Sequence, residues 1–183
     1  MTTLKSETTP PDILAFADAL QLGASAAPKT EAERELHLVA FRLDQEEFAV
    51  PIAKIREIVR VGDITRIPQA PPHIRGVMNL RGRILPVVEL RTRLDLPVLD
   101  VTSHSRVLVA DAQGRTLGLL VDSVAEVVKV PEKAVVPPPD DILAANAEYI
   151  KGVARLGSRL LILLDLDQAV IQGNSNSNST NAP

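Results

Sequence analysis

The sequence contains no cysteine and no tryptophan, and its aromatic side chains are limited to three phenylalanines and one tyrosine. The absence of cysteine excludes disulfides, thiolate metal sites and thiol nucleophiles. Because aromatic residues make up only 2% of the chain, the core must be aliphatic, and the stacking platforms of single-stranded nucleic-acid binders are missing. The formal net charge of −3 gives no electrostatic reason to bind a polyanion. We therefore expect no nucleic-acid partner.

Long hydrophobic runs are also absent. A membrane-spanning helix needs roughly 20 apolar residues in a row, and no part of the sequence approaches that length. The start of the chain carries a single lysine, and the apolar stretch that follows is interrupted by Asp18 and Gln21, unlike a secretory signal. These absences predict a cytoplasmic protein that does not insert into the membrane.

Patterns that carry enzymatic chemistry are missing as well. The histidines His37, His73 and His104 do not stand in metal-ligand spacing with one another or with carboxylates. The sequence has no phosphate-binding loop, no dinucleotide-binding fingerprint and no serine in a nucleophile-elbow context. We therefore expect a protein without catalytic residues, metal or cofactor.

The most informative feature that is present is a repeated hairpin. Residues 74–90 read as two strands joined at Arg81-Gly82, because glycine suits a tight turn and apolar residues flank it on both sides. Residues 150–166 repeat this pattern without a gap, with Ile, Gly, Val, Leu, Arg, Leu and Leu at matching positions. Such agreement indicates a tandem duplication.

The two copies of the hairpin differ in the turn, where Arg81 is replaced by Gly157. A tight turn needs only small residues, so the long cation at position 81 is surplus to the fold and is the first candidate for function. Glu57 is the candidate for holding its guanidinium in place. The counterpart of Glu57 in the second copy, Glu126, is also acidic, so a role in local structure is equally open for Glu57.

The duplication covers a unit of about sixty residues that reads strand, strand, short helix, strand, strand, strand. The short helix of the first copy is predicted over residues 52–59, where isoleucines recur at helical spacing. Short strands without a full crossover helix between them exclude a parallel α/β sheet. We predict an all-β fold with minor α content, in which each unit curls into a small five-stranded barrel and the two barrels share a seam.

Composition sets the limits of the folded part. We expect a flexible N-terminal extension over residues 1–35, a folded region over residues 36–172, and a disordered Asn/Ser tail over residues 173–183. Within the folded region, the order of the repeats places the first barrel at about 36–95 and the second at about 104–170.

Parts of both copies resemble the sequences of a known family. The stretches that carry the resemblance are residues 41–58, 66–91, 118–124 and 149–152. The most specific of them contains Ile74-Arg75-Gly76-Val77-Met78-Asn79-Leu80-Arg81-Gly82. These stretches are similar to the CheW coupling proteins of bacterial chemotaxis. The resemblance extends over about residues 36–170 and implies two intertwined five-stranded SH3-like β-barrels.

The resemblance also implies a function. A protein of this family is a non-enzymatic adaptor that joins the cytoplasmic tip of chemoreceptors, the methyl-accepting chemotaxis proteins, to the regulatory domain of the histidine kinase CheA. Receptor contact is implied near Ile55, Glu57, Gly76 and Arg81, and kinase contact on the barrel ends, with no residues assigned. Two alternatives stay open: a similar scaffold of a non-flagellar pathway such as pilus motility, and a small-molecule-binding or enzymatic barrel, since a fold does not fix a function.

Overall fold

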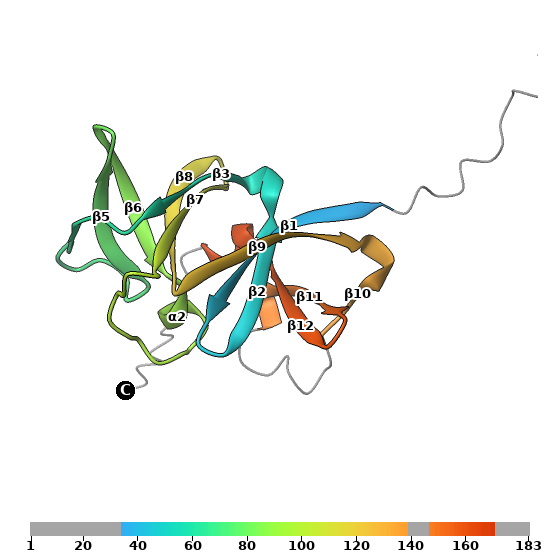
Figure 1. Cartoon of the computed structure of the whole chain (residues 1–183). Helices are drawn as coiled ribbons and strands as arrows, with labels where there is room; N and C mark the ends of the chain where they lie inside the picture. Colours follow the sequence, from blue (N-terminus) through green and yellow to red (C-terminus); the bar gives the residue numbers. More distant parts are fainter. Residues whose placement is uncertain (1–33, 139–146, 171–183) are drawn as a thin grey trace, which may run out of the picture. The chain divides into compact units, whose positions relative to one another are not determined.

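The computed structural model describes residues 34–138 and 147–170, which are mainly β-structure (Figure 1). Apart from Arg34 and Glu35, the extension expected over residues 1–35 and the tail expected over residues 173–183 lie outside the described residues.

Short strands follow one another along the chain with few helical residues between them. The strands are β1 (Glu35–Leu43), β2 (Glu46–Pro51), β3 (Ile55–Arg60), β4 (Ile64–Thr65), β5 (Ile74–Leu80), β6 (Arg83–Glu89), β7 (Arg106–Ala112), β8 (Arg115–Val121), β9 (Ser123–Pro131), β10 (Val135–Val136), β11 (Ile150–Leu156) and β12 (Arg159–Leu164). The helical segments are η1 (Ile52–Lys54), α2 (Leu90–Arg93), η2 (Glu132–Ala134), η4 (Ala147–Tyr149) and α4 (Leu166–Ala169). The all-β fold class with minor α content is confirmed.

The strands form two six-stranded sheets. Sheet A has the order β10-β11-β12-β2-β1-β9, and sheet B has the order β3-β7-β8-β6-β5-β4. Each sheet contains one hairpin from the other half of the chain, since β1–β2 pairs with β9 and β12 whereas β7–β8 pairs with β3 and β6. In Figure 1, β1 and β2 accordingly lie with β9–β12, and β7 and β8 lie with β3. The two halves are intertwined, as the resemblance implies.

The sheets cross the predicted division at about 36–95 and 104–170, since β1–β2 lie in sheet A and β7–β8 lie in sheet B. Sheet B consists of residues 55–89 and 106–121, and sheet A consists of β1, β2 and β9–β12. Each sheet also has six strands instead of five, because the two-residue strands β4 and β10 pair with β5 and β11. Strand pairing follows which faces can be buried together, and chain order alone does not reveal it.

The helix expected over residues 52–59 is largely a strand. Only η1 is helical, and β3 begins at Ile55 and pairs antiparallel with β7. Ile55, Ile58 and Val59 are β-branched, and such side chains pack well on a pleated surface and lose rotamer freedom in a helix. The helical spacing of the isoleucines was therefore misleading, and the residue type was the better guide.

Three hydrophobic clusters stabilise the two sheets and their contact. One lies on sheet A and includes Leu38, Ala40 and Leu161, and another lies on sheet B and includes Val87, Val107 and Val109. The third and largest cluster joins the sheets; its members include Val39, Phe41, Phe48 and Val50 from β1–β2 and Leu108, Ala110, Leu119 and Val121 from β7–β8. The exchanged hairpins therefore supply much of the core that the sheets share.

The strands of the exchanged hairpins are buried on both faces. Along β1, Leu38 and Ala40 pack in the cluster of sheet A, whereas Val39 and Phe41 pack in the shared cluster. Along β7, residues 107–110 alternate in the same way between the cluster of sheet B and the shared cluster. A strand that is buried on both sides has no polar face, which explains the unbroken apolar runs in both segments.

A buried arginine and its aspartate partner join three loops. Arg91 of α2 is 2% exposed; its Nε and Nη2 donate to the two carboxylate oxygens of Asp122 at 2.9 and 2.5 Å, and its Nη1 donates to the carbonyl of Pro97 at 2.6 Å. The backbone N–H of Asp44, in the β1–β2 turn, donates to Asp122 as well, at 2.7 Å. Burial would raise the pKa of Asp122, but these hydrogen bonds outweigh burial and lower the pKa.

Because both sheets contribute to one core, we expect them to unfold together. Differential scanning calorimetry of the full chain should show one transition whose calorimetric enthalpy equals its van't Hoff enthalpy. Two resolved transitions would mean that each sheet is stable without the shared cluster.

Asp122→Asn should destabilise the protein by about 2 kcal/mol at pH 7, because it removes the nearer counter-charge of the buried Arg91. Asp44, 3.7 Å from Arg91, and the partial exposure of Asp122 limit the loss. The pKa of Asp122 is lower in the folded chain than in the unfolded chain, so its contribution to stability exists above the unfolded pKa and is lost as the pH falls through the folded pKa. In urea titrations the difference from wild type should shrink steadily between pH 7 and pH 2. Asp100→Asn, in the exposed connection before β7, is the control and should change stability little at any pH.

Candidate functional site

The sequence singles out four residues, which we call the hairpin-tip site: Ile55, Glu57, Gly76 and Arg81. Ile55 and Glu57 belong to β3, Gly76 lies in β5, and Arg81 occupies the turn between β5 and β6. All four belong to sheet B, in which β3 is one edge strand and β4, next to β5, is the other. These residues can contact one another only if the sheet curls so that β3 approaches the β5–β6 turn.

Arg81 lies in the left-handed region of backbone space. Its φ is +52°, and that of Gly82 is +82°, the arrangement of a two-residue hairpin turn that matches the twist of the strands. The side-chain oxygen of Asn79 accepts a hydrogen bond from the N–H of Gly82 at 2.8 Å and supports the turn. A residue with a Cβ in this conformation costs about 1 kcal/mol, and the second copy avoids the cost with Gly157, whose φ is +60°. The fold therefore gains nothing from an arginine here.

The guanidinium of Arg81 is oriented by Glu57, as the sequence predicts. Nη2 of Arg81 lies 2.8 Å from Oε2 of Glu57, and the two side chains are 77% and 29% exposed. The ion pair links β3 to the β5–β6 turn. In the strand order of the sheet, β7 and β8 lie between these two elements. An exposed ion pair adds little stability, but it holds a planar group with further donors at the surface.

Ile55 is half-buried and faces the shared core, not the interior of sheet B. The pairing of β3 with β7 shifts register between Ile55 and Glu57, and the bulge turns the strand so that Ile55 packs on the shared cluster while Val59 packs in the cluster of sheet B. The apolar side chain that β3 does present is Ile58, which is 42% exposed. Reading this segment as a strand would have identified Ile58, because alternation places it outward.

Gly76 is buried and is explained by the fold. Its φ is +151°, and a Cβ at this position would lie 2.2 Å from the carbonyl oxygen of Thr65 in β4. The matching Gly152 of the second copy would meet Val135 of β10 at 2.6 Å. Both glycines therefore allow a short edge strand to approach closely. The structure brings Gly76 into the same sheet as Arg81 but leaves it little surface to offer a partner.

Two further ion pairs lie along η1 and β3. Nε of Arg56 lies 2.6 Å from Asp111 of β7, and Nζ of Lys54 lies 3.0 Å from Asp167 of α4. The hydrogen bond from Arg56 lowers the pKa of Asp111, and those from the Gln113 N–H and from Lys54 lower the pKa of Asp167. Neither carboxylate could be identified from the sequence, because neither has a counterpart in the other copy or a spacing that marks it.

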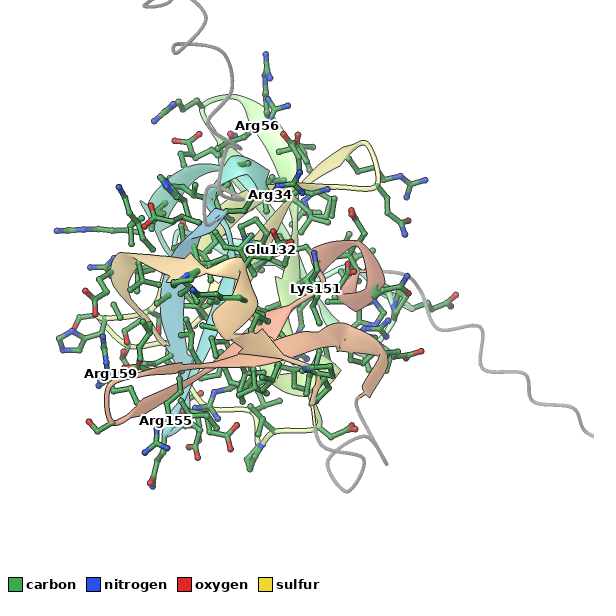
Figure 2. The ribbon with its side chains drawn as sticks, turned by 90° about the vertical axis from the view of Figure 1, so that its right-hand side faces the viewer. Arg34, Arg56, Glu132, Lys151, Arg155 and Arg159 are labelled. Carbon is green, nitrogen blue, oxygen red and sulfur yellow. The ribbon has the colours of Figure 1, made fainter. Side chains whose placement is uncertain are left out.

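The second copy keeps the acidic residue but pairs it differently. Glu126 accepts a hydrogen bond of 2.6 Å from Nη2 of Arg159, and Arg159 is the counterpart of Arg83, not of Arg81. Arg159 also lies 3.4 Å from Glu47. Figure 2 shows Arg159 beside Arg155 and well apart from Arg56 on β3. Both sheets therefore have an acidic residue at the position of Glu57 and Glu126, but only the β5–β6 hairpin has a cation in its turn.

Within residues 34–138 and 147–170, no group of three His, Asp or Glu side chains is placed to hold a metal ion. No helix in the same described ranges is long and apolar enough to cross a membrane.

Comparison with known proteins shows the family. Residues 37–172 match the model of the CheW-like domain, and the chain belongs to the CheW-like family. The chemotaxis protein CheW of Rhizobium meliloti is 36% identical over 138 residues, which cover 75% of this chain and 88% of that protein. The chemotaxis protein CheW of Treponema pallidum is 34% identical over 143 residues, covering 76% and 84%. The crystal structure of the scaffolding protein TtCheW from Thermoanaerobacter tengcongensis superimposes with a TM-score of 0.71 at 29% identity, covering 76% of this chain and 95% of that one.

Gly76→Ala should destabilise the protein by about 3 kcal/mol, because the added methyl group would overlap a backbone oxygen that cannot move without separating β4 from β5. Chemical denaturation measures the loss. Gly82→Ala is the control: it has open space around the Cβ and should cost only about 1 kcal/mol of backbone strain. Equal losses in the two variants would show that close packing at Gly76 is unimportant.

Proposed function

We propose that the protein is a non-enzymatic adaptor that couples the cytoplasmic tip of chemoreceptors to the regulatory domain of a CheA-type histidine kinase. Membership of the CheW-like family and the likeness to a scaffolding protein support a role in chemotaxis signalling. In this proposal the protein works in the cytoplasm and reaches the membrane only through the receptors that it binds.

The observation that carries the receptor-binding part is the strained, exposed and oriented Arg81. Glu57 engages one end of the guanidinium at 2.8 Å, and 77% of the side chain stays exposed. A planar group with five N–H donors suits carboxylates and the free carbonyl groups at the end of a helix. A chemoreceptor tip is a helical hairpin, and its bend offers such acceptors.

The apolar part of the proposed receptor contact comes from β3 and η1. Ile58 and Ile52 are exposed on either side of the half-buried Ile55, and an amphipathic helix binds such a surface through apolar side chains at helical spacing. Glu57 positions Arg81 in this account, and Gly76 acts through the packing of β4 on β5.

Arg81→Ala should weaken binding of a receptor-tip fragment by about 1 to 3 kcal/mol, the range for loss of a charged hydrogen bond at an interface. Titration calorimetry measures this affinity and, separately, the affinity for the kinase regulatory domain, which should be almost unchanged. Arg81→Lys should give an intermediate loss, because it keeps the charge and loses the fork.

Arg83→Ala is the matched control, since Arg83 is exposed on the same hairpin and should bind both partners as the wild type does. Wild-type affinity of Arg81→Ala for the receptor would overturn the assignment of Arg81. An equal loss of both partners, accompanied by a lower melting temperature, would point to misfolding instead.

A further inference from the structure

The bulge in β3 carries an arginine that the fold does not require. The register of β3 against β7 shifts between Ile55 and Glu57, so Arg56 is the extra residue of the bulge. The second copy has a bulge at the same point, because the pairing of β9 with β1 skips Ala125. Alanine therefore suffices at this bulge, as glycine suffices at the turn that holds Arg81.

An acidic residue holds Arg56 in place, just as Glu57 holds Arg81. Nε of Arg56 donates to Oδ2 of Asp111 at 2.6 Å, and Oγ1 of Thr116, opposite Asp111 in β8, donates to Oδ1 at 2.8 Å. The hydrogen bonds from Arg56 and Thr116 lower the pKa of Asp111, so its carboxylate stays ionised at neutral pH. The guanidinium of Arg56 therefore has a charged anchor on the sheet.

The two anchoring acids lie on one face of sheet B. Glu57 is directly opposite Val109 of β7, and Asp111 is two residues further along the same strand. Opposed residues share a face and every second residue of a strand returns to it, so Glu57 and Asp111 are diagonal neighbours. Such neighbours are about 7 to 8 Å apart. The guanidiniums of Arg56 and Arg81 are therefore anchored on the same face by separate acids.

The cations lie further out than the acids that hold them. The side chains of Arg56 and Asp111 are 58% and 39% exposed, and those of Arg81 and Glu57 are 77% and 29% exposed. We call Arg56 and Arg81, with these two acids, the paired-arginine surface. A partner that approaches this surface meets the guanidiniums first. Each guanidinium has five N–H donors, and a carboxylate held against it bidentately accepts two, so donors remain for a second carboxylate.

We propose that the paired-arginine surface recognises two carboxylates that lie one turn apart on a helix of the chemoreceptor tip. Acidic residues at i and i+4 of a helix have Cβ atoms about 5 to 6 Å apart, and their side chains can spread to reach both guanidiniums. A single small anion fits less well, because it would have to draw together two cations that separate acids hold apart.

This inference rests on the proposed adaptor function and adds Arg56 to it as a specificity-determining residue. Arg81 alone can pair with any carbonyl or carboxylate at the receptor bend. Two guanidiniums at a set spacing favour a helix with a matching pair of acids over one without it. Their anchors also reduce the loss of side-chain freedom that binding would otherwise cost.

Arg56→Ala should weaken binding of a receptor-tip fragment about tenfold, which corresponds to about 1.4 kcal/mol. Titration calorimetry measures the affinity. The melting temperature should not change, because the second copy has Ala125 at the same bulge. Arg56→Gln, which keeps most of the side chain, should show the same loss of affinity. Arg60→Ala is the matched control: Arg60 is an exposed arginine of the same strand, on the opposite face from Glu57 by alternation, and the variant should bind as the wild type does.

Double-mutant cycles identify the partner groups. Each exposed acidic residue of the receptor-tip fragment is changed in turn to glutamine and titrated against the wild type, Arg56→Ala and Arg81→Ala. One acid should couple to Arg56, and a second acid one helical turn away should couple to Arg81. A purely structural role of Arg56 would give no such coupling.

The proposal fails, and the adaptor function stands, if Arg56→Ala binds the fragment as the wild type does while Arg81→Ala binds it more weakly. Equal losses in Arg56→Ala and Arg60→Ala would show a general attraction between charges and also refute it. So would cycles in which no acid couples to Arg56, or in which the coupled acids are not one turn apart. A wild-type chain that does not bind the fragment would overturn the adaptor function and this inference with it.

Discussion

The structure depends on the burial of both faces of β1 and β7. Residues 38–41 and 107–110 alternate between a cluster within one sheet and the cluster shared by both. This alternation is possible only if one face of each strand points into its own sheet's cluster and the opposite face packs against the other sheet. The exchange of β1–β2 and β7–β8 between the halves therefore satisfies the apolar patterning. Arg91 and Asp122 then supply the polar contacts between the loops around the exchanged hairpins.

Local features of the fold were predictable from the sequence, and non-local ones were not. The β5–β6 hairpin and its turn could be located because Gly82 and the flanking apolar residues are a local signal. The exchange of hairpins joins residues as distant as Val39 and Val127, and no neighbouring residue encodes that pairing. The unbroken apolar runs in β1 and β7 fit burial on both faces, but they do not identify the partner strands.

The candidate site shows the same division. The pairing of Arg81 with Glu57 was predictable, because comparison of the two copies shows that the turn needs only a small residue and that the arginine is additional. The misassigned helix over residues 52–59 hid Ile58, since a helical reading gives the wrong outward face. Arg91 reads in the sequence as one of several charges after the hairpin, and only the packing of α2 against Asp122 shows that it is buried. The burial of His73 gave no local signal either, because the residues around it come from separate segments of the chain.

The parallel pairing of β12 with β2 and of β6 with β8 has a consequence for folding and assembly. Each half of the chain holds an incomplete set of strands for both sheets, so neither half can close a core before the other has been synthesised. Folding must wait for pairings that are distant in sequence, and such topologies fold slowly. During that interval the β1–β2 hairpin of one molecule fits the open sheet of a second molecule as well as its own. Such pairing between two molecules would give a swapped dimer, and Arg91, which joins the end of β6 to Asp122 and Pro97, favours the intramolecular product.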